Sequence, residues 1–259
     1  MELSGKVALI TGAGSGLGRA SAIRLAEEGA DVVLVSRSQD ELDAVARIAR
    51  DGGRRALAIA ADISHDKEMM GVFERIEEEM GRLDIVFANA GINGVWAPIE
   101  ELQPDEWDKT IAINLRGTYL TIHYAVPMLK RQGGAIVITS SINGTRTFST
   151  AGGSAYSTTK GGQLALGQML ALELAEHKIR VNVVCPGAIE SKIDENTEKR
   201  HTEEAEVPVE YPEGSIALTG GKPGKAEDVA ELVLFLVSDR SRHISGTPVW
   251  IDGTQSLLV

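Results

Sequence analysis

Residues 7–18 read VALITGAGSGLG, and this stretch decides the fold. Val7 to Ile10 is a short unbroken apolar run, which is typical of a strand buried on both faces. A glycine-rich turn follows at 11–18, then a helical pattern that ends near Gly29, then a second apolar run at 32–35. A strand, a glycine turn, a helix and a second strand form the βαβ unit, in which the two strands are parallel.

Strands and helices keep alternating along the chain. Further strands are expected at 56–61, 83–88, 135–139, 180–184 and 247–251, and further helices at 39–51, 66–80, 104–131, from Tyr156 onward and at 226–238. Alternation of this kind predicts an α/β fold with a parallel sheet. We expect a single Rossmann-like, doubly wound domain over residues 1–259, with a seven-stranded parallel sheet flanked by helices on both faces.

The periodic pattern fades between about 190 and 225. Two prolines, Pro208 and Pro212, interrupt this stretch, and many of its residues are acidic. A loop of this length inside a compact domain is usually functional. Because it follows the carboxyl end of a strand, where open α/β sheets bind ligands, we interpret it as a lid over a substrate site. The alternative is an acidic surface excursion without a role.

Composition and charge limit the function classes. The chain has 259 residues and a net charge of -11, which argues against a nucleic-acid partner. Its single cysteine, Cys185, excludes an intrachain disulfide and favours a reducing compartment. No apolar run approaches the roughly 18 residues of a membrane span, and no signal segment precedes the first strand. We therefore expect a cytoplasmic protein without a membrane partner. Its five scattered histidines show no metal-ligand spacing.

Tyr156 and Lys160 are the first candidate pair for chemistry. On a helix, residues four apart lie on one face. A nearby ammonium favours the phenolate and lowers the pKa of a tyrosine from about 10 towards working pH. Such a tyrosine could exchange a proton with a reacting oxygen. The spacing alone is also that of two ordinary surface neighbours.

Gly12, Gly16 and Gly18 indicate a phosphate-binding turn. Glycine allows a tight turn and lets a pyrophosphate approach the N-terminus of the following helix. The strand before the turn and the helix after it are the context that this motif requires. Close packing of helix on sheet would explain Gly18 alone, but not three glycines together.

With its Thr-Gly-x-x-x-Gly-x-Gly spacing, the chain resembles the short-chain dehydrogenase/reductase family, in its single-domain branch. The resemblance extends through Asn89-Ala90-Gly91, Asn114, Ser141, the Tyr156-x-x-x-Lys160 motif and Pro186-Gly187, which follow one another in the family's order. It implies a nicotinamide cofactor and an oxidoreductase. The positions that it implies for cofactor contact are Gly12, Ser15, Gly16, Leu17, Gly18, Ser36, Arg37, Asp62, Ile63, Asn89, Ala90, Gly91, Tyr156, Lys160, Pro186, Gly187, Ile189 and Ser191.

The end of the second strand bears on the choice between NAD(H) and NADP(H). NAD-binding proteins tend to carry an acidic residue there for the ribose hydroxyls. This chain has Ser36-Arg37 instead, and an arginine can pair with a 2′-phosphate. We therefore expect NADP(H) to be favoured over NAD(H). Arg37 could equally be a solvated residue at the end of the strand. In that case only the absence of an acidic residue favours NADP(H). The resemblance implies that the side chain of Asp62 holds the adenine. Alternatively, Asp62 caps the helix that follows.

The resemblance implies a catalytic set of Asn114, Ser141, Tyr156 and Lys160. Tyr156 is the general acid or base, Ser141 donates to the reacting oxygen, Lys160 lowers the pKa of Tyr156 and binds ribose, and Asn114 holds a water. Ser140 and Ser154 compete for the serine role, and Ser141 is favoured because it fits the turn after the strand. Asn114 could instead simply hydrogen-bond a neighbouring strand.

The substrate pocket is expected to include Asn93, Trp96, Phe148 and Tyr211, although a loop aromatic is often only a packing anchor. The resemblance implies assembly as a homotetramer, through the apolar helix after Lys160 and the last strand. Three functions remain open. The first is an NADP(H)-dependent carbonyl reductase or secondary alcohol dehydrogenase acting on a small ketone or alcohol. The others are an NAD-linked sugar or polyol dehydrogenase and a non-catalytic cofactor sensor.

Overall fold

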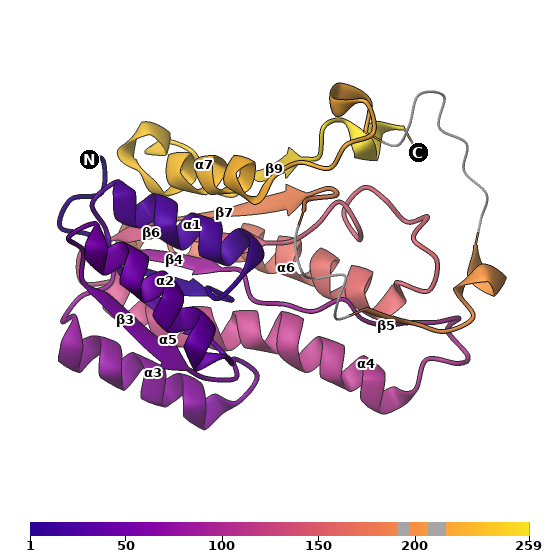
Figure 1. Cartoon of the computed structure of the whole chain (residues 1–259), viewed down its shortest axis with the longest axis horizontal. Helices are drawn as coiled ribbons and strands as arrows, with labels where there is room; N and C mark the ends of the chain where they lie inside the picture. Colours follow the sequence, from indigo (N-terminus) through magenta and orange to yellow (C-terminus); the bar gives the residue numbers. More distant parts are fainter. Residues whose placement is uncertain (191–196, 207–215, 259) are drawn as a thin grey trace.

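Seven parallel strands form the central sheet, in the order β3-β2-β1-β4-β6-β7-β9 (Figure 1). Their bounds are β1 Val7–Thr11, β2 Asp31–Ser36, β3 Ala56–Ala60, β4 Ile85–Ala88, β6 Gly134–Thr139, β7 Ile179–Pro186 and β9 Pro248–Ile251. The structure is a computed structural model, and it describes residues 1–190, 197–206 and 216–258. The expected seven-stranded parallel sheet is confirmed, and the strand order reverses between β1 and β4.

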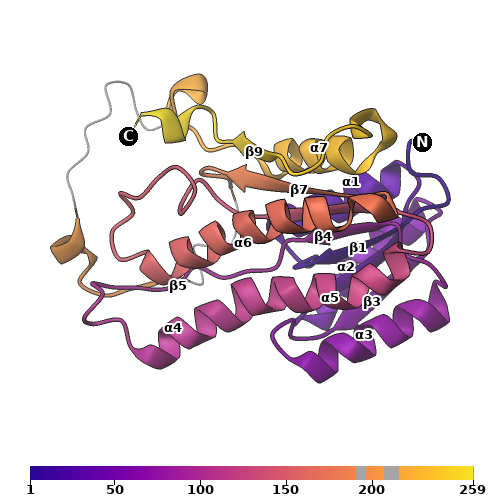
Figure 2. The same cartoon turned by 180° about the vertical axis from the view of Figure 1, so that it is seen from behind.

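Helices cover both faces of this sheet, as expected. The α-helices are α1 Gly16–Glu27, α2 Gln39–Asp51, α3 Asp66–Glu79, α4 Pro104–Thr110, α5 Gly117–Leu129, α6 Ser154–Glu173 and α7 Ala226–Val237. Short 3-10 turns lie at Ala175–His177, Thr202–Ala205, Ala217–Thr219, Asp239–Ser241 and Gln255–Leu257. Figures 1 and 2 show α1, α2 and α7 on one face and α3, α5 and α6 on the other.

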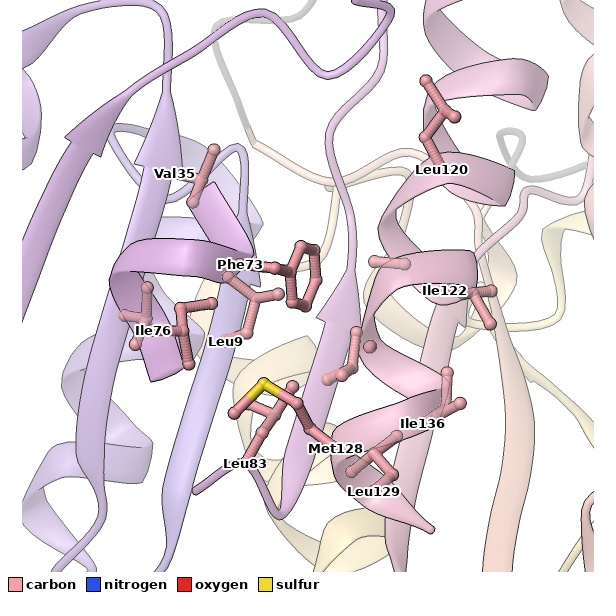
Figure 3. Close-up of a cluster of buried hydrophobic side chains, with 14 of the residues drawn as sticks. Leu9, Val35, Phe73, Ile76, Leu83, Leu120, Ile122, Met128, Leu129 and Ile136 are labelled. Carbon is pink, nitrogen blue, oxygen red and sulfur yellow. The ribbon is translucent and has the colours of Figure 1, made fainter. Parts of the chain in front are cut away.

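Each face has its own hydrophobic core. Phe73 and Ile76 of α3 pack with Leu129 of α5 over Leu9 and Ile136 of the sheet (Figure 3). The opposite core joins side chains of α1, α2 and α7 to the other faces of the same strands. Because alternate residues of a strand point to opposite faces, a strand covered on both sides is mostly apolar. All five residues of β1 are buried, and only Thr11 at its end is polar.

The long helical region expected at 104–131 is interrupted. A π-helical turn, Ile111–Arg116, separates α4 from α5, although the whole region runs as one rod (Figure 2). A π turn releases a carbonyl from the regular hydrogen-bond ladder. Here the Asn114 carbonyl accepts from Thr118 Oγ1 at 2.7 Å and from Gln163 Nε2 of α6 at 2.9 Å. No sequence period signals such a turn.

A second, two-stranded parallel sheet pairs β5 Gly94–Trp96 with β8 Thr197–Lys199. Neither strand was expected from the sequence, because three-residue strands are too short for a pattern. The pairing fixes residues 197–199, within the region expected to be a lid, beside the loop that follows β4. In the described part of the chain, no helix is both long and apolar enough to cross a membrane.

Candidate active site

A cavity of about 810 Å³ opens where the carboxyl ends of β1, β4, β6 and β7 meet. In open α/β sheets, ligands bind at the point where the strand order reverses, which here lies between β1 and β4. Fifteen of the residues expected at the site line it: Gly12, Ser15, Gly16, Leu17, Asn89, Ala90, Gly91, Asn93, Trp96, Ser141, Tyr156, Lys160, Pro186, Gly187 and Ile189.

The glycine turn forms one wall of this cavity. Gly12 and Gly16 have φ angles of 68° and 50°, which disfavour any residue with a side chain. A side-chain carbon on Gly18 would lie only 2.1 Å from the Gly12 carbonyl oxygen, so Gly18 closes the turn without lining the cavity. The turn leaves the N-terminus of α1 open towards the cavity, as a dinucleotide pyrophosphate requires.

Asn89 ties three strands together beneath the cavity. The Thr11 hydroxyl accepts from the backbone N–H groups of Asn89 and Ala90, at 3.0 and 3.1 Å. The Asn89 side chain donates to the Thr11 carbonyl at 3.1 Å and accepts from Thr139 Oγ1 at 3.2 Å. These bonds connect the ends of β1, β4 and β6. Asn89 therefore fixes the floor of the cavity.

Tyr156 and Lys160 lie on one face of α6, and both are buried. Lys160 Nζ donates to the Thr139 carbonyl at 2.9 Å and lies 5.4 Å from the centroid of the Tyr156 ring. Burial lowers the pKa of the Lys160 ammonium to about 8. The group is still mostly charged at neutral pH, so a positive charge lies beside the Tyr156 ring.

The structure separates the three candidate serines. Ser140 Oγ donates to the Lys160 carbonyl at 2.7 Å, so its proton is used within the fold. Ser141 Oγ accepts from the Asn143 N–H at 3.1 Å, which leaves its own proton available at the cavity wall. Ser154 begins α6, and it is not among the residues that line the cavity.

Asn114 is completely buried next to the pair on α6. Its Oδ1 accepts from the Ile92 N–H at 2.8 Å, and its Nδ2 donates to the Ile92 carbonyl at 2.8 Å and to Thr159 Oγ1 at 3.2 Å. The side chain thus bridges the loop after β4 and α6. Its partners lie in a loop and in a helix, not in the neighbouring strand that the sequence left as an alternative, and the bond to Thr159 anchors α6 one residue before Lys160.

The residues expected around the adenosine lie at the ends of β2 and β3. Ser36 is half-buried and Arg37 is exposed. Asp62 accepts from the N–H and the hydroxyl of Ser64, at 2.9 and 2.7 Å. Burial opposes ionisation of Asp62, but these bonds and the positive charges of His65 and Arg37 together lower its pKa. Ile63 is buried and packs against Gly117 of α5.

On the substrate side, Trp96 faces Tyr156, with 6.4 Å between the ring centroids. Asn93 Nδ2 donates to Thr197 Oγ1 of β8 at 2.7 Å. Phe148, expected in the pocket, is 76% exposed and lies outside the cavity lining, because the loop turns its ring towards solvent. Ser191 and Tyr211 lie outside the described residues.

Gln255 was not expected at the site from the sequence, whereas Ile216 falls within the region expected to be a lid. Gln255 and Ile216 line the cavity, and Gln255 Oε1 accepts from the Ala188 N–H at 2.8 Å. They come from turns without any periodicity, so only the folded chain brings them to the site. Within the described residues, no group of three or more His, Cys, Asp or Glu side chains could hold a metal ion.

Known proteins resemble this chain over nearly its whole length. A family model described as enoyl-(acyl carrier protein) reductase matches residues 12–254. Levodione reductase of Leifsonia aquatica is 38% identical, over 97% of this chain and 94% of that protein. The chain belongs to the short-chain dehydrogenase/reductase family. It is an oxidoreductase of that family, and the family's enzymes act on alcohol and ketone groups.

Solved structures of this family carry the same fold. A 3-ketoacyl-ACP reductase from Sinorhizobium meliloti 1021 is 56% identical, covers 98% of this chain and 100% of its own, and superposes with a TM-score of 0.94. A 3-ketoacyl-(acyl-carrier-protein) reductase from Brucella melitensis, 34% identical, is complexed with NADH; it covers 98% of this chain and 99% of its own, at TM-score 0.86. A short-chain dehydrogenase from Burkholderia cenocepacia J2315, 35% identical, contains NADP; it covers 98% of both chains, at TM-score 0.85. These neighbours support a nicotinamide cofactor.

Proposed function

We propose that this family member is an NADP(H)-dependent carbonyl reductase or secondary alcohol dehydrogenase for a small ketone or alcohol. The observation that carries the proposal is the Tyr156–Lys160 pair, which is buried at the cavity that Ser141 also lines. A sensor would need the glycine turn but no phenol, ammonium and hydroxyl gathered at one wall. The complete set therefore favours catalysis over the sensor alternative.

Each side chain has a role that follows from its surroundings. When bound, a nicotinamide cofactor would supply or take the hydride. As negative charge grows on the substrate oxygen, Ser141 donates a hydrogen bond and Tyr156 donates a proton as general acid. Lys160 stabilises the phenolate that remains and would also bind the nicotinamide ribose. Asn114 positions α6 and, with Lys160, would hold a water. In oxidation, Tyr156 is the base.

The remaining cofactor contacts form part of the same proposal. Ser15, Gly16 and Leu17 would hold the pyrophosphate, Asp62 and Ile63 the adenine, and Asn89, Ala90 and Gly91 the nicotinamide ribose. Pro186, Gly187 and Ile189, with Ser191, would hold the carboxamide. Ser36 and Arg37 would accept the 2′-phosphate, since a guanidinium pairs well with phosphate. Asn93 and Trp96 would contact the substrate, beneath a lid at about 190–225.

A fluorescence titration of the purified protein with NADPH and with NADH, without substrate, tests the cofactor proposal. Tighter binding of NADPH is expected. Tighter binding of NADH would overturn it and favour the NAD-linked sugar or polyol dehydrogenase. Binding of neither would overturn the proposed activity as a whole, and it would favour a protein that keeps the dinucleotide fold without catalysis.

We also propose that the chain, as one domain, forms a homotetramer in the cytoplasm. Met169 and Leu172 of α6 are 72% and 83% exposed, and Leu257 near the C-terminus is 66% exposed. Large apolar side chains gathered on one helix face usually mark an interaction surface. Light scattering should give four times the chain mass of 27.6 kDa. A mass equal to one chain would contradict this assembly.

A further inference from the structure

Glu41 brings a carboxylate to the adenosine end of the cofactor site. It lies in the first turn of α2, where the Ser38 hydroxyl accepts from its backbone N–H at 3.5 Å. A side-chain carbon placed on Gly14 would lie 2.7 Å from Glu41 Oε2 and 2.9 Å from Glu41 Cβ. The same point lies 3.2 Å from Ser36 Oγ. The Glu41 side chain therefore lies across the glycine turn, in the corner that this turn forms with the end of β2.

This corner is where the fold places the adenosine ribose. In dinucleotide-binding βαβ units, an acidic residue near the end of the second strand accepts hydrogen bonds from the ribose hydroxyls. Ser36 occupies the last position of β2, so no acid stands there. Glu41, which follows in α2, returns a carboxylate to the same corner. The absence of an acidic residue at the end of β2 predicts NADP(H). The tertiary structure nevertheless brings the Glu41 carboxylate to the same corner.

The Glu41 carboxylate has no cationic partner among the described residues. No Lys or Arg side chain in 1–190, 197–206 or 216–258 forms an ion pair with it. Arg37, the nearest cation in sequence, is exposed, and its charge acts on Asp62 at the end of β3. The positive and the negative group thus approach the ribose from different elements. A 2′-phosphate would meet both of them.

We propose that Glu41 is a specificity-determining residue, which accepts hydrogen bonds from the ribose hydroxyls of NAD(H) and opposes the 2′-phosphate that Arg37 attracts. The balance of the two residues lets the enzyme use both cofactors, with a smaller preference for NADP(H) than Arg37 alone would give. This inference rests on the proposed dinucleotide-linked function. It assigns the preference to a residue that lies outside the usual position at the strand end.

The test is the dissociation constant of each cofactor for Glu41→Gln and the wild type, measured by fluorescence titration without substrate. Glutamine keeps the size of the side chain and removes its charge. Removing one negative charge beside a phosphate dianion should tighten NADPH binding by about three- to tenfold at low salt, and by less at high salt. NADH binding should weaken by about two- to fivefold, because a neutral acceptor is weaker than a charged one.

Two matched variants complete the design. Asp40→Asn removes a carboxylate from the same helical turn, but on another face of α2, so its ratio of the two dissociation constants should stay within about twofold of wild type. Glu41→Asp keeps the charge but moves it away from the glycine turn, because the side chain is shorter. Its ratio of the two dissociation constants should lie between those of the wild type and Glu41→Gln. An unchanged ratio in Glu41→Gln, or an equal change in Asp40→Asn, would overturn the inference.

The failure of this inference is distinguishable from failure of the proposed cofactor preference. If the wild type favours NADH, the preference for NADP(H) is wrong, yet the ratio in Glu41→Gln still reports on Glu41. If the wild type favours NADPH and Glu41→Gln does not shift the ratio, only the role of Glu41 is wrong.

Discussion

Lys160 Nζ lies 5.4 Å from the centroid of the Tyr156 ring, and the two side chains are only 3% and 9% exposed. One helical turn therefore places a buried cation beside a buried phenol at the wall of the cavity. Keeping an ammonium out of water is costly unless it has partners, and here the Lys160 ammonium donates to the Thr139 carbonyl. A buried charge of this kind lowers stability, and it is more typical of an active site than of a contact that stabilises the fold.

Replacing Tyr156 with Phe should abolish turnover but preserve cofactor binding. The ring stays, so its packing near Trp96 is retained, whereas the proton donor is lost. Loss of general acid catalysis should lower kcat by at least about 10²- to 10⁴-fold. Steady-state kinetics and an NADPH titration measure both properties. Tyr124→Phe, which removes a phenol that donates to Asp66 on the surface, is the matched control. Turnover near the wild-type rate in Tyr156→Phe would refute the acid assignment.

Replacing Lys160 with Met should inactivate the enzyme but stabilise it at neutral pH. Burial lowers the pKa of Lys160 from 10.5 to about 8, so the folded state disfavours the charged form. Below pH 8 the group is charged in both states and the penalty is complete. The penalty disappears as pH rises from about 8 to about 10.5. The variant should gain about 1–3 kcal/mol of unfolding free energy at pH 7, less whatever the lost bond to Thr139 contributes.

Urea denaturation at pH 7 and pH 10 measures this difference. The advantage of Lys160→Met over wild type should shrink at pH 10, and Lys130→Met, at an exposed position, controls for the loss of a charge. An advantage that grows with pH would contradict the sign of the pKa shift.

Trp250 of β9 should position Ser141 through Thr145. Trp250 Nε1 donates to Thr145 Oγ1 at 3.2 Å, and that hydroxyl donates to the Ser141 carbonyl at 2.5 Å. Arg146 stacks over the Trp250 ring at 3.5 Å. Trp250→Phe keeps a ring for Arg146 and loses only the N–H bond, so kcat should fall about three- to tenfold, while NADPH binding is unchanged. Trp107→Phe is the control. A lower melting temperature with an unchanged kcat would indicate that Trp250 has a purely structural role.

Arg200 should hold β8 against the rim of the cavity. Its guanidinium donates to both carboxylate oxygens of Glu106, at 3.1 and 2.8 Å, and to the Glu101 carbonyl at 2.7 Å. Glu106→Gln should speed proteolytic cleavage within 197–206 by about two- to fivefold and raise KM for the substrate, because ion pairs near the surface contribute modestly to stability. Glu79→Gln, which breaks the remote pair with Arg75, should change neither property.

The Arg200–Glu106 pair should also make the contact that holds β8 at the rim of the cavity depend on pH. Hydrogen bonds from Arg200, followed by the backbone bond from Gln103, lower the pKa of Glu106 below its usual value of 4.5. The contact is therefore complete above pH 4.5 and is lost as pH falls through the lowered pKa. Protease sensitivity of 197–206 that rises already between pH 7 and pH 5 would contradict this origin.

Local patterns in the sequence determined most of the fold. The apolar runs such as Val7 to Ile10 predicted each strand of the main sheet, because a strand covered on both faces leaves no room for polar residues. The glycine turn predicted the dinucleotide crevice, because glycine adopts the positive φ angle found at Gly12 more readily than any residue with a side chain. The spacing of Tyr156 and Lys160 predicted that they share a helix face. Each inference depended only on residues close together in the chain.

Tertiary structure decided what depends on residues far apart in the chain. The β5–β8 pairing joins segments about one hundred residues apart, and the π turn at Asn114 is supported by Gln163 from another helix. Phe148 turned out to point towards solvent, since no local pattern fixes the direction of a loop side chain. The position of Glu41 across Gly14 follows from the packing of α2 on the glycine turn. Such contacts are set by how whole elements pack, which short-range periodicity does not encode.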